Sequence, residues 1–274
     1  MKIKFLFIFL FAVLIPGLCG AFVPETPHLL YMVMEKIKRP VGIEVYQTKK
    51  IINYNSIETE SVELDEKLSY AFPNQFRSQM LSPDFSGFTV ESNFEFIKVM
   101  DGKTVSRKKS NIDRYADVLL YRDYRELMYM LDRDGVDTTD VSFQRYKDTI
   151  CYVIGRPPEI GKNHAGLWIE KDTFFPLKYV IHNNDLIVAF YYDEWQQVSK
   201  TWYPMRIRIF MDDQMFAVIQ AKQVNLKKIE LNTRFDIRYL AKLYPENITQ
   251  PSDEEKDPVD ELDQQIENFK KLYE

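Results

Sequence analysis

Apolar and polar residues alternate along most of residues 41–109, and this period of two constrains the fold more than any other feature of the sequence. The alternating apolar residues are Val41, Ile43, Val45, Leu68, Tyr70, Phe72, Phe94 and Phe96. Successive side chains of a strand point to opposite faces, so the pattern predicts strands that bury one face. The Asp101-Gly102 pair between two such runs is typical of a tight hairpin turn, because glycine tolerates positive φ.

Strand patterns resume in the second half of the chain, over residues 141–154, 166–182, 186–195, 203–211 and 215–236. Asp212-Asp213 lies between the last two runs and is expected to form a hairpin tip. The whole chain is therefore predicted to hold roughly ten long antiparallel strands.

Two helices are predicted among these strands. Thr26-Pro27 begins the first, with threonine as N-cap and proline at the first helical position, and Pro40 ends it. The second covers residues 114–134 and ends at Gly135 as the C′ residue. Its apolar residues extend well beyond one stripe, so it needs cover on more than one side. The fold class is mostly β with helices, an α+β arrangement.

Residues 1–21 have the three parts of a secretory signal peptide: a basic start at Lys2 and Lys4, a short apolar run, and Cys19-Gly20-Ala21 as a small-residue cleavage site. A membrane anchor is the alternative, but no other segment approaches the ~18 apolar residues of a spanning helix. The mature protein is expected to work outside the cytoplasm.

The two cysteines give little support to covalent chemistry. Cys19 could be acylated in a bacterial lipoprotein, but Leu18 and Pro16 do not fit that processing site. Cleavage after Ala21 leaves Cys151 alone, which excludes an internal disulfide. Cys151 lies in an apolar run, where a buried inert thiol is expected.

Charge divides the chain into a neutral body and an acidic end. Residues 22–245 hold 31 basic and 31 acidic residues, whereas residues 246–274 hold ten acidic and three basic ones. A neutral body indicates neither a nucleic-acid nor an anionic-membrane partner. We therefore expect a signal peptide over 1–21, one domain over 22–245, and an acidic linker with a terminal helix over 246–274. That helix either docks on the domain or binds a partner.

Motifs for catalysis, metals and cofactors are missing. The chain has three histidines, which are dispersed, and it lacks the sequence signatures of nucleophile elbows, zinc proteases, P-loops and dinucleotide sites. No cofactor and no metal site are predicted. Carboxylates are numerous enough that a hidden acidic pair stays open, so an exported hydrolase remains the weakest alternative.

Aromatic residues and methionine are abundant, with 17 Tyr, 19 Phe, 3 Trp and 10 Met. An ordinary β-sheet core accounts for many of them. A curved sheet with a broadly apolar helix across its concave face also encloses a space that suits apolar ligands such as acyl chains. Burial of an acyl chain gains ~0.8 kcal/mol per CH₂, so such a cavity would need no catalytic residue.

Several local phrases, taken in order, resemble the LolA/LolB-like family of periplasmic lipoprotein carriers. They are the helix Thr26 to Lys38, Pro73-Asn74-Gln75-Phe76-Arg77, Asp101-Gly102-Lys103-Thr104, Leu167-Trp168-Ile169-Glu170-Lys171-Asp172, Phe175-Pro176-Leu177, Trp202-Tyr203-Pro204, and Leu231-Asn232 with Phe235. The resemblance spans about residues 25 to 240. It implies an incomplete antiparallel β-barrel, or strongly curved sheet, with a helical lid over an apolar cavity, and it places the helix at 114–134 in the lid position.

One position departs from the family pattern. Lipoprotein carriers of this family commonly have an arginine immediately before the proline that matches Pro73, and it helps to latch the lid until cargo is loaded. This chain has Phe72 there, and Arg77 follows four residues after Pro73. The departure weakens the case for lipoprotein sorting more than the case for the fold.

The resemblance implies a periplasmic, monomeric, non-enzymatic carrier or chaperone for the acyl chains of a lipoprotein or lipid, with a membrane-associated transfer partner. The expected cavity wall consists of Phe94, Phe96, Leu120, Tyr124, Leu127, Met128, Trp168, Tyr179 and Ile209. A lipoprotein-sensing or protein-interaction module with the same fold is the alternative.

Overall fold

The structure is a computed structural model that describes residues 23–53, 60–82, 86–156, 164–183 and 186–246. The expected signal peptide and the expected C-terminal helix lie outside these residues. Within them, no helix is long and apolar enough to cross a membrane.

Thirteen strands form one antiparallel sheet, in the order β6-β5-β4-β3-β2-β1-β13-β12-β11-β10-β9-β8-β7. The strands are β1 Gly42–Asn53, β2 Glu60–Ala71, β3 Gln75–Met80, β4 Gly87–Ser92, β5 Glu95–Met100, β6 Lys103–Ser106, β7 Val141–Tyr146, β8 Thr149–Ile154, β9 Gly166–Glu170, β10 Pro176–Asn183, β11 Leu186–Val198, β12 Thr201–Met211 and β13 Gln214–Leu226. Strands β6 and β7 are the edges and do not pair with each other, so the sheet is open. This confirms the predicted fold class of a curved antiparallel sheet with helices.

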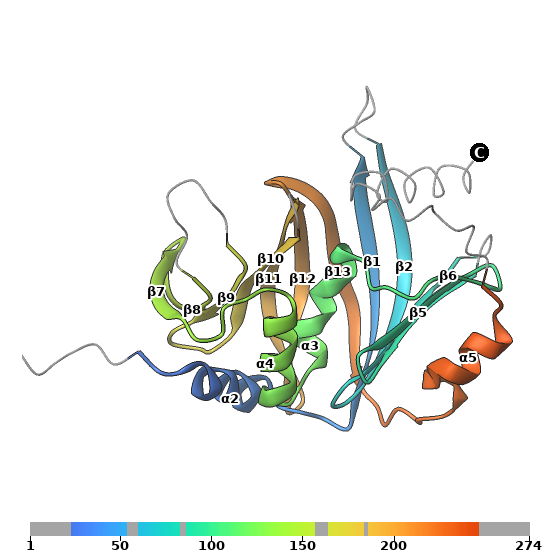
Figure 1. The fold of residues 1–274 in the computed structure, drawn as a ribbon, viewed down its shortest axis with the longest axis horizontal. Coiled ribbons are helices and arrows are strands. Elements are labelled where there is room, and N and C mark those ends of the chain that lie inside the picture. The colour runs from blue at the N-terminus through green and yellow to red at the C-terminus, as the bar shows by residue number, and fades with distance from the viewer. Residues whose placement is uncertain (1–22, 54–59, 83–85, 157–163, 184–185, 247–274) are drawn as a thin grey trace, which may run out of the picture.

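The chain runs through the sheet as two meanders. Strands β1 to β6 step outward from the centre, and β7 to β13 step back from the opposite edge until β13 pairs with β1. Residues 111–134, which we call the crossing segment, lie between β6 and β7 in the chain and contain η2 Asn111–Ala116, α3 Asp117–Leu120 and α4 Tyr124–Arg133. Figure 1 shows α3 and α4 between the two arms of the sheet, beside α2 Thr26–Ile37.

The main core lies on the face of the sheet that α2 and the crossing segment cover, which we call the inner face. Helix α2 buries Leu29, Leu30, Val33 and Ile37 there, which confirms the first predicted helix, although Glu25 rather than Thr26 is its N-cap residue. The strands contribute alternate residues such as Ile43, Val45, Leu68, Tyr70, Ile207 and Ile209. The period of two in the sequence thus does mark one buried face.

The prediction of one continuous helix over residues 114–134 is wrong. Residues 121–123 separate α3 from α4, because the Asp123 side chain accepts hydrogen bonds from the backbone N–H groups of Arg125 and Glu126 and starts a new helix. The end is as predicted: Gly135 has φ of +82°, and Val136 N–H bonds to the Leu131 carbonyl.

Three other boundaries differ from the prediction. The run 141–154 is a hairpin of β7 and β8 turning at Lys147, whose φ is 52°, and 166–182 divides into β9 and β10. The last run ends at Leu226, which pairs with Ile43 near the start of β1. The chain then forms η3 Thr233–Phe235 and α5 Ile237–Leu243. The predicted Asp101-Gly102 and Asp212-Asp213 turns are both confirmed.

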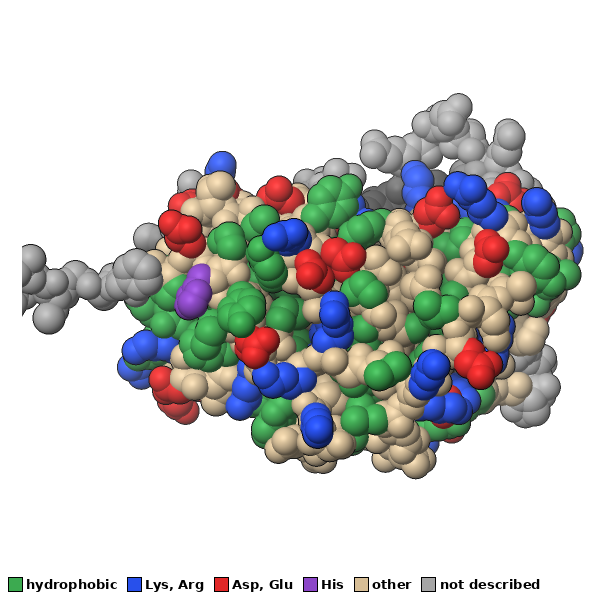
Figure 2. Space-filling model, turned by 90° about the horizontal axis from the view of Figure 1, so that it is seen from below, with side chains coloured by type: hydrophobic (Ala, Val, Ile, Leu, Met, Phe, Trp, Pro, Cys, Tyr) green, Lys and Arg blue, Asp and Glu red, His purple; other side chains and the backbone are tan. Residues whose placement is uncertain are grey.

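Helix α5 covers the opposite, outer face of the sheet at β4 and β5. Its Ile237 and Leu240, with Phe235, pack against Val90, Ile97 and Val99 as a second apolar cluster. Figure 1 shows α5 far from α2 and α4, at the other end of the molecule. The side of the molecule seen from below in Figure 2 carries interspersed basic, acidic and apolar side chains without a large patch of one charge.

Candidate functional site

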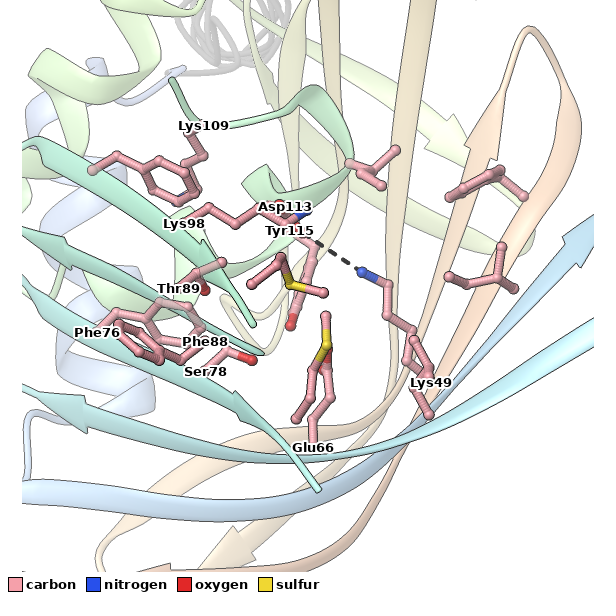
Figure 3. Close-up of a pocket in the computed structure, with 17 residues that line it drawn as sticks. Lys49, Glu66, Phe76, Ser78, Phe88, Thr89, Lys98, Lys109, Asp113 and Tyr115 are labelled. Atoms are coloured by element: carbon pink, nitrogen blue, oxygen red, sulfur yellow. Dashed lines mark ion pairs between the residues drawn. The ribbon is translucent and has the colours of Figure 1, made fainter. Parts of the chain in front are cut away.

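A pocket lies between β1–β5 and η2, where the crossing segment leaves part of the inner face uncovered (Figure 3). Its apolar lining comes from Ile51, Leu64, Phe76, Met80, Phe88, Phe96, Met100, Ile112 and Phe216. Its polar lining comes from Lys49, Glu66, Ser78, Thr89, Lys98, Lys109, Asp113 and Tyr115. The pocket has a volume of only ≈ 50 Å³. It can hold a few water molecules but not a long ligand.

The alternation of β1 and β2 places polar side chains in the middle of the inner face. On β1, Gln47 and Lys49 follow Ile43 and Val45 on the same face, and the Gln47 amide donates to the carboxylate of Glu66 on β2 (2.8 Å) and to the Tyr115 hydroxyl (3.2 Å). These polar groups divide the apolar core near α2 from the apolar pocket.

Lys49 fastens the crossing segment to β1 across this pocket. Its Nζ lies 3.5 Å from an oxygen of Asp113 in η2, and Figure 3 shows the two side chains pointing toward each other. Burial alone would raise the pKa of Asp113, but Lys49 and Lys98 outweigh burial and lower it. Asp113 is therefore ionised and holds η2 on the sheet by charge.

A second buried group joins the start of the crossing segment to β4. We call it the Lys109 cluster: the ammonium of Lys109 contacts the carboxylates of Glu91 and Asp117, and the Tyr121 hydroxyl donates to Glu91. The Lys109, Glu91 and Asp117 side chains are 7%, 3% and 0% exposed. Lys109 thus contacts two buried carboxyl groups at once.

The two carboxylates of the Lys109 cluster differ in their pKa. Burial opposes ionisation of Glu91, but Lys109 and Tyr121 outweigh burial and lower its pKa. Burial raises the pKa of Asp117 to about 7, against the opposing effect of Lys109 and with added repulsion from Glu91. Within the described part of the chain, the Oδ2 atom of Asp117 has no hydrogen-bond partner. Of the two carboxyl groups, Asp117 is therefore the one that takes up a proton first as the pH falls.

The end of α4 is held to β10 by Asp134. Its carboxylate pairs with Arg114 and accepts a hydrogen bond from the Tyr179 hydroxyl (2.7 Å). Burial and the Asp134 charge raise the pKa of Tyr179 well above its ordinary value, so the hydroxyl stays a donor.

Tyr179→Phe is expected to lower the free energy of unfolding by about 1.5–3 kcal/mol, because it removes a buried hydrogen bond to a carboxylate. Denaturation in urea measures the change. Tyr191→Phe on the outer face is the matched control, since among the described residues its hydroxyl donates to no carboxylate. Equal effects of the two substitutions would contradict the assigned role of the Tyr179 hydroxyl.

The nine predicted wall residues fall into four places. Phe96 alone lines the pocket. Leu120, Leu127, Tyr179 and Ile209 are fully buried in the main core, and Tyr124 and Met128 pack against it. Phe94 stacks on Tyr121, with ring centroids 4.9 Å apart. Trp168 lies away from the others, in a cluster with Cys151, Val153, Val180 and Ala189.

Phe72, at the position where the family pattern has an arginine, contacts a cation from the crossing segment. The Arg122 guanidinium lies 5.2 Å from the centre of the Phe72 ring, is 3% exposed, and donates to the carbonyls of Leu119 and Lys38. Arg77, in contrast, donates to the carbonyl of Arg234 next to α5. The contact between sheet and crossing segment at this position therefore uses Arg122 and not Arg77.

Metal and nucleophilic chemistry find no support in the part of the chain that the structure describes. No group of three or more His, Cys, Asp or Glu side chains there could hold a metal ion. Cys151 is buried, as predicted, and burial raises the pKa of its thiol to about 11.

Comparison with solved structures identifies this arrangement of sheet and helices. A LolA superfamily protein from Nitrosomonas europaea matches with a TM-score of 0.51 and 11% identity, over 76% of this chain and 96% of that chain. The chain has the fold of LolA superfamily proteins. The resemblance predicted from the sequence is thereby confirmed at the level of the fold.

Two further structures share the LolA-like fold. A domain assigned to an outer membrane lipoprotein-sorting protein from Vibrio parahaemolyticus matches with a TM-score of 0.54 and 9% identity, over 78% of this chain and 97% of that chain. A DUF1329 family protein from Desulfovibrio piger matches with a TM-score of 0.53 and 12% identity, over 80% and 100%. No family model matches the sequence, and no curated protein matches it significantly.

Proposed function

We propose that this protein is a non-enzymatic carrier that shields an acyl chain of a lipoprotein or lipid in the pocket on its inner face. It works in the periplasm after removal of residues 1–21, and a membrane-associated partner receives the cargo. The observation that supports this most is the pocket itself, whose apolar lining opens beside a ring of lysines and carboxylates. Apolar walls suit an acyl chain, and the polar groups suit the head to which it is attached.

Cargo enters in this proposal by displacement of the crossing segment. The pocket of ≈ 50 Å³ is too small for an acyl chain while η2 covers it. No strand pairing includes the crossing segment, so it can move without breaking the sheet. Lys49–Asp113 and Asn74–Glu126 (3.0 Å) are contacts that such a movement would release. Burial of a dozen CH₂ groups gains on the order of 10 kcal/mol, and this gain has to offset those two contacts, the Lys109 cluster and the apolar residues of the crossing segment that would leave the core.

Met80→Asp tests the proposal. Met80 lines the pocket and is half-buried, so the substitution places a carboxylate beside the bound chain without opening the main core. Binding of a triacylated lipopeptide, measured by native mass spectrometry, is expected to weaken by at least about tenfold, which corresponds to ~1.4 kcal/mol. Leu81→Asp is the matched control, because the adjacent Leu81 is 44% exposed and does not line the pocket.

Purification of residues 22–274 from a bacterial periplasm adds a direct observation. An acylated species released by solvent extraction would support the proposal. A protein that is empty and also refuses added phospholipid and lipopeptide would overturn it, as would equal binding by the Met80→Asp and Leu81→Asp variants.

A further inference from the structure

A second cavity lies on the outer face, between β2, β3 and the segment that follows β13. It has a volume of ≈ 230 Å³. Its basic lining residues are Lys67, Arg77, Lys227, Lys228 and Arg234, and its acidic ones are Glu44 and Glu230. The body of the protein is electrically neutral, so this surplus of positive charge is a local feature.

Glu44 does not neutralise the cavity. Its carboxylate serves two lysines at once, Lys67 at 3.0 Å and Lys227 at 3.4 Å. Burial opposes ionisation of Glu44, but the two lysines outweigh burial and lower its pKa. Within the described ranges, Arg77, Lys228 and Arg234 form no ion pair.

Arg77 is the most constrained of these cations. Its guanidinium lies 4.0 Å from the centre of the Phe88 ring, and Nη1 donates to the Arg234 carbonyl (3.1 Å). Its Nε is buried and has no hydrogen-bond partner among the residues that the structure describes. Burial, together with repulsion from Arg234, lowers the pKa of Arg77 to about 10. The fold therefore holds a guanidinium in place without a counter-ion, at a cost that a bound anion would offset.

We propose that this outer cavity binds a phosphate group through Arg77, Lys228 and Arg234. Two guanidinium groups match the oxygens of a phosphate in bidentate geometry, and the neighbouring lysine adds charge that suits a doubly charged anion. The hydroxyl of Ser69 and the amide of Gln79 also line the cavity and supply neutral donors. The phosphate belongs either to a free small molecule or to the head group of a phospholipid. The site is separate from the inner pocket and does not depend on acyl-chain binding.

The test uses the mature chain with two double variants that remove the same charge. Lys228→Gln/Arg234→Gln removes two exposed cations that line the cavity. Arg238→Gln/Lys242→Gln removes two exposed cations of α5 that do not. Calorimetry with inorganic phosphate is the first arm. Sedimentation with vesicles of phosphatidylcholine and phosphatidylglycerol, against vesicles of phosphatidylcholine alone, is the second.

We expect the cavity variant to weaken binding by at least about tenfold in one arm, and the α5 variant to retain it. If the cavity variant loses binding of inorganic phosphate, the ligand is a free phosphate compound. If it loses binding only to the anionic vesicles, the ligand is a phospholipid head group. Absence of wild-type binding in both arms, or equal weakening by both variants, would overturn the inference. Met80→Asp, which changes the inner pocket, should leave phosphate and vesicle binding unchanged. A failure of the carrier proposal can therefore be distinguished from a failure of this inference.

Discussion

Lys109→Met is expected to lower the free energy of unfolding by about 3–5 kcal/mol, the typical cost of removing one partner of a buried ion pair. The substitution leaves Glu91 and Asp117 facing each other at 3% and 0% exposure, with no cation between them. Methionine preserves most of the side-chain volume, so the loss reports the charge and not a cavity. Urea denaturation measures it.

Two variants make this result specific. Lys108→Met changes the neighbouring residue, which is exposed, and should shift stability by less than about 0.5 kcal/mol. Adding Glu91→Gln and Asp117→Asn to Lys109→Met replaces both buried carboxyl groups with amides and should recover much of the loss. If Lys109→Met is as stable as Lys108→Met, the Lys109 cluster does not hold the crossing segment on the sheet.

Asp117→Asn is expected to gain stability relative to the wild type as the pH rises from about 4 to about 7. The folded protein holds the Asp117 proton up to a pKa of about 7, whereas the unfolded chain releases it near 3.8, the ordinary pKa of an aspartate. Between these values the folded state binds more protons, so this group lowers wild-type stability with rising pH, by at most about 1.4 kcal/mol per unit. Above pH 7 the difference between the two proteins should be constant.

Urea denaturation at a series of pH values, with Asp113→Asn as the control, tests this dependence. The pKa of Asp113 is lowered, so its contribution is lost only at a pH below 3.8, and the control should track the wild type between pH 4 and 7. A difference between Asp117→Asn and the wild type that does not change with pH would contradict the assignment of the proton to Asp117.

The strands could be predicted from the sequence because the inner face of the sheet is apolar, so apolar and polar residues alternate along each strand. The ends of elements could not, since long-range contacts decide them. Strand β13 ends where β1 begins, with Leu226 paired to Ile43 and Lys227 N–H bonded to the Gly42 carbonyl, and the local sequence near residue 226 does not show this end. Residues 114–134 read as one helix because the break at 121–123 depends on a cap by Asp123 and on the burial of Tyr121 and Arg122.

The candidate site was harder to predict than the fold. Leu120 and Leu127 were expected to line a cavity and are fully buried in the core, because periodicity does not distinguish a residue that fills the core from one that lines a pocket. Trp168 follows Leu167 directly on β9, so its side chain points to the other face of that strand. Lys49, Glu91, Lys109 and Asp117 are each of a residue type that is normally solvated, and only their meeting across the sheet shows their role.

The pairing of β1 with β13 also bears on how the chain folds. Every other pairing in the sheet joins strands that are consecutive in sequence, whereas this one joins residues such as Ile43 and Leu226. Each meander can therefore assemble from local hairpins soon after it is synthesised. The edge of β1 that pairs with β13, however, stays unpaired until β13, the last strand, is synthesised. Until then, that edge can pair with strands of other chains.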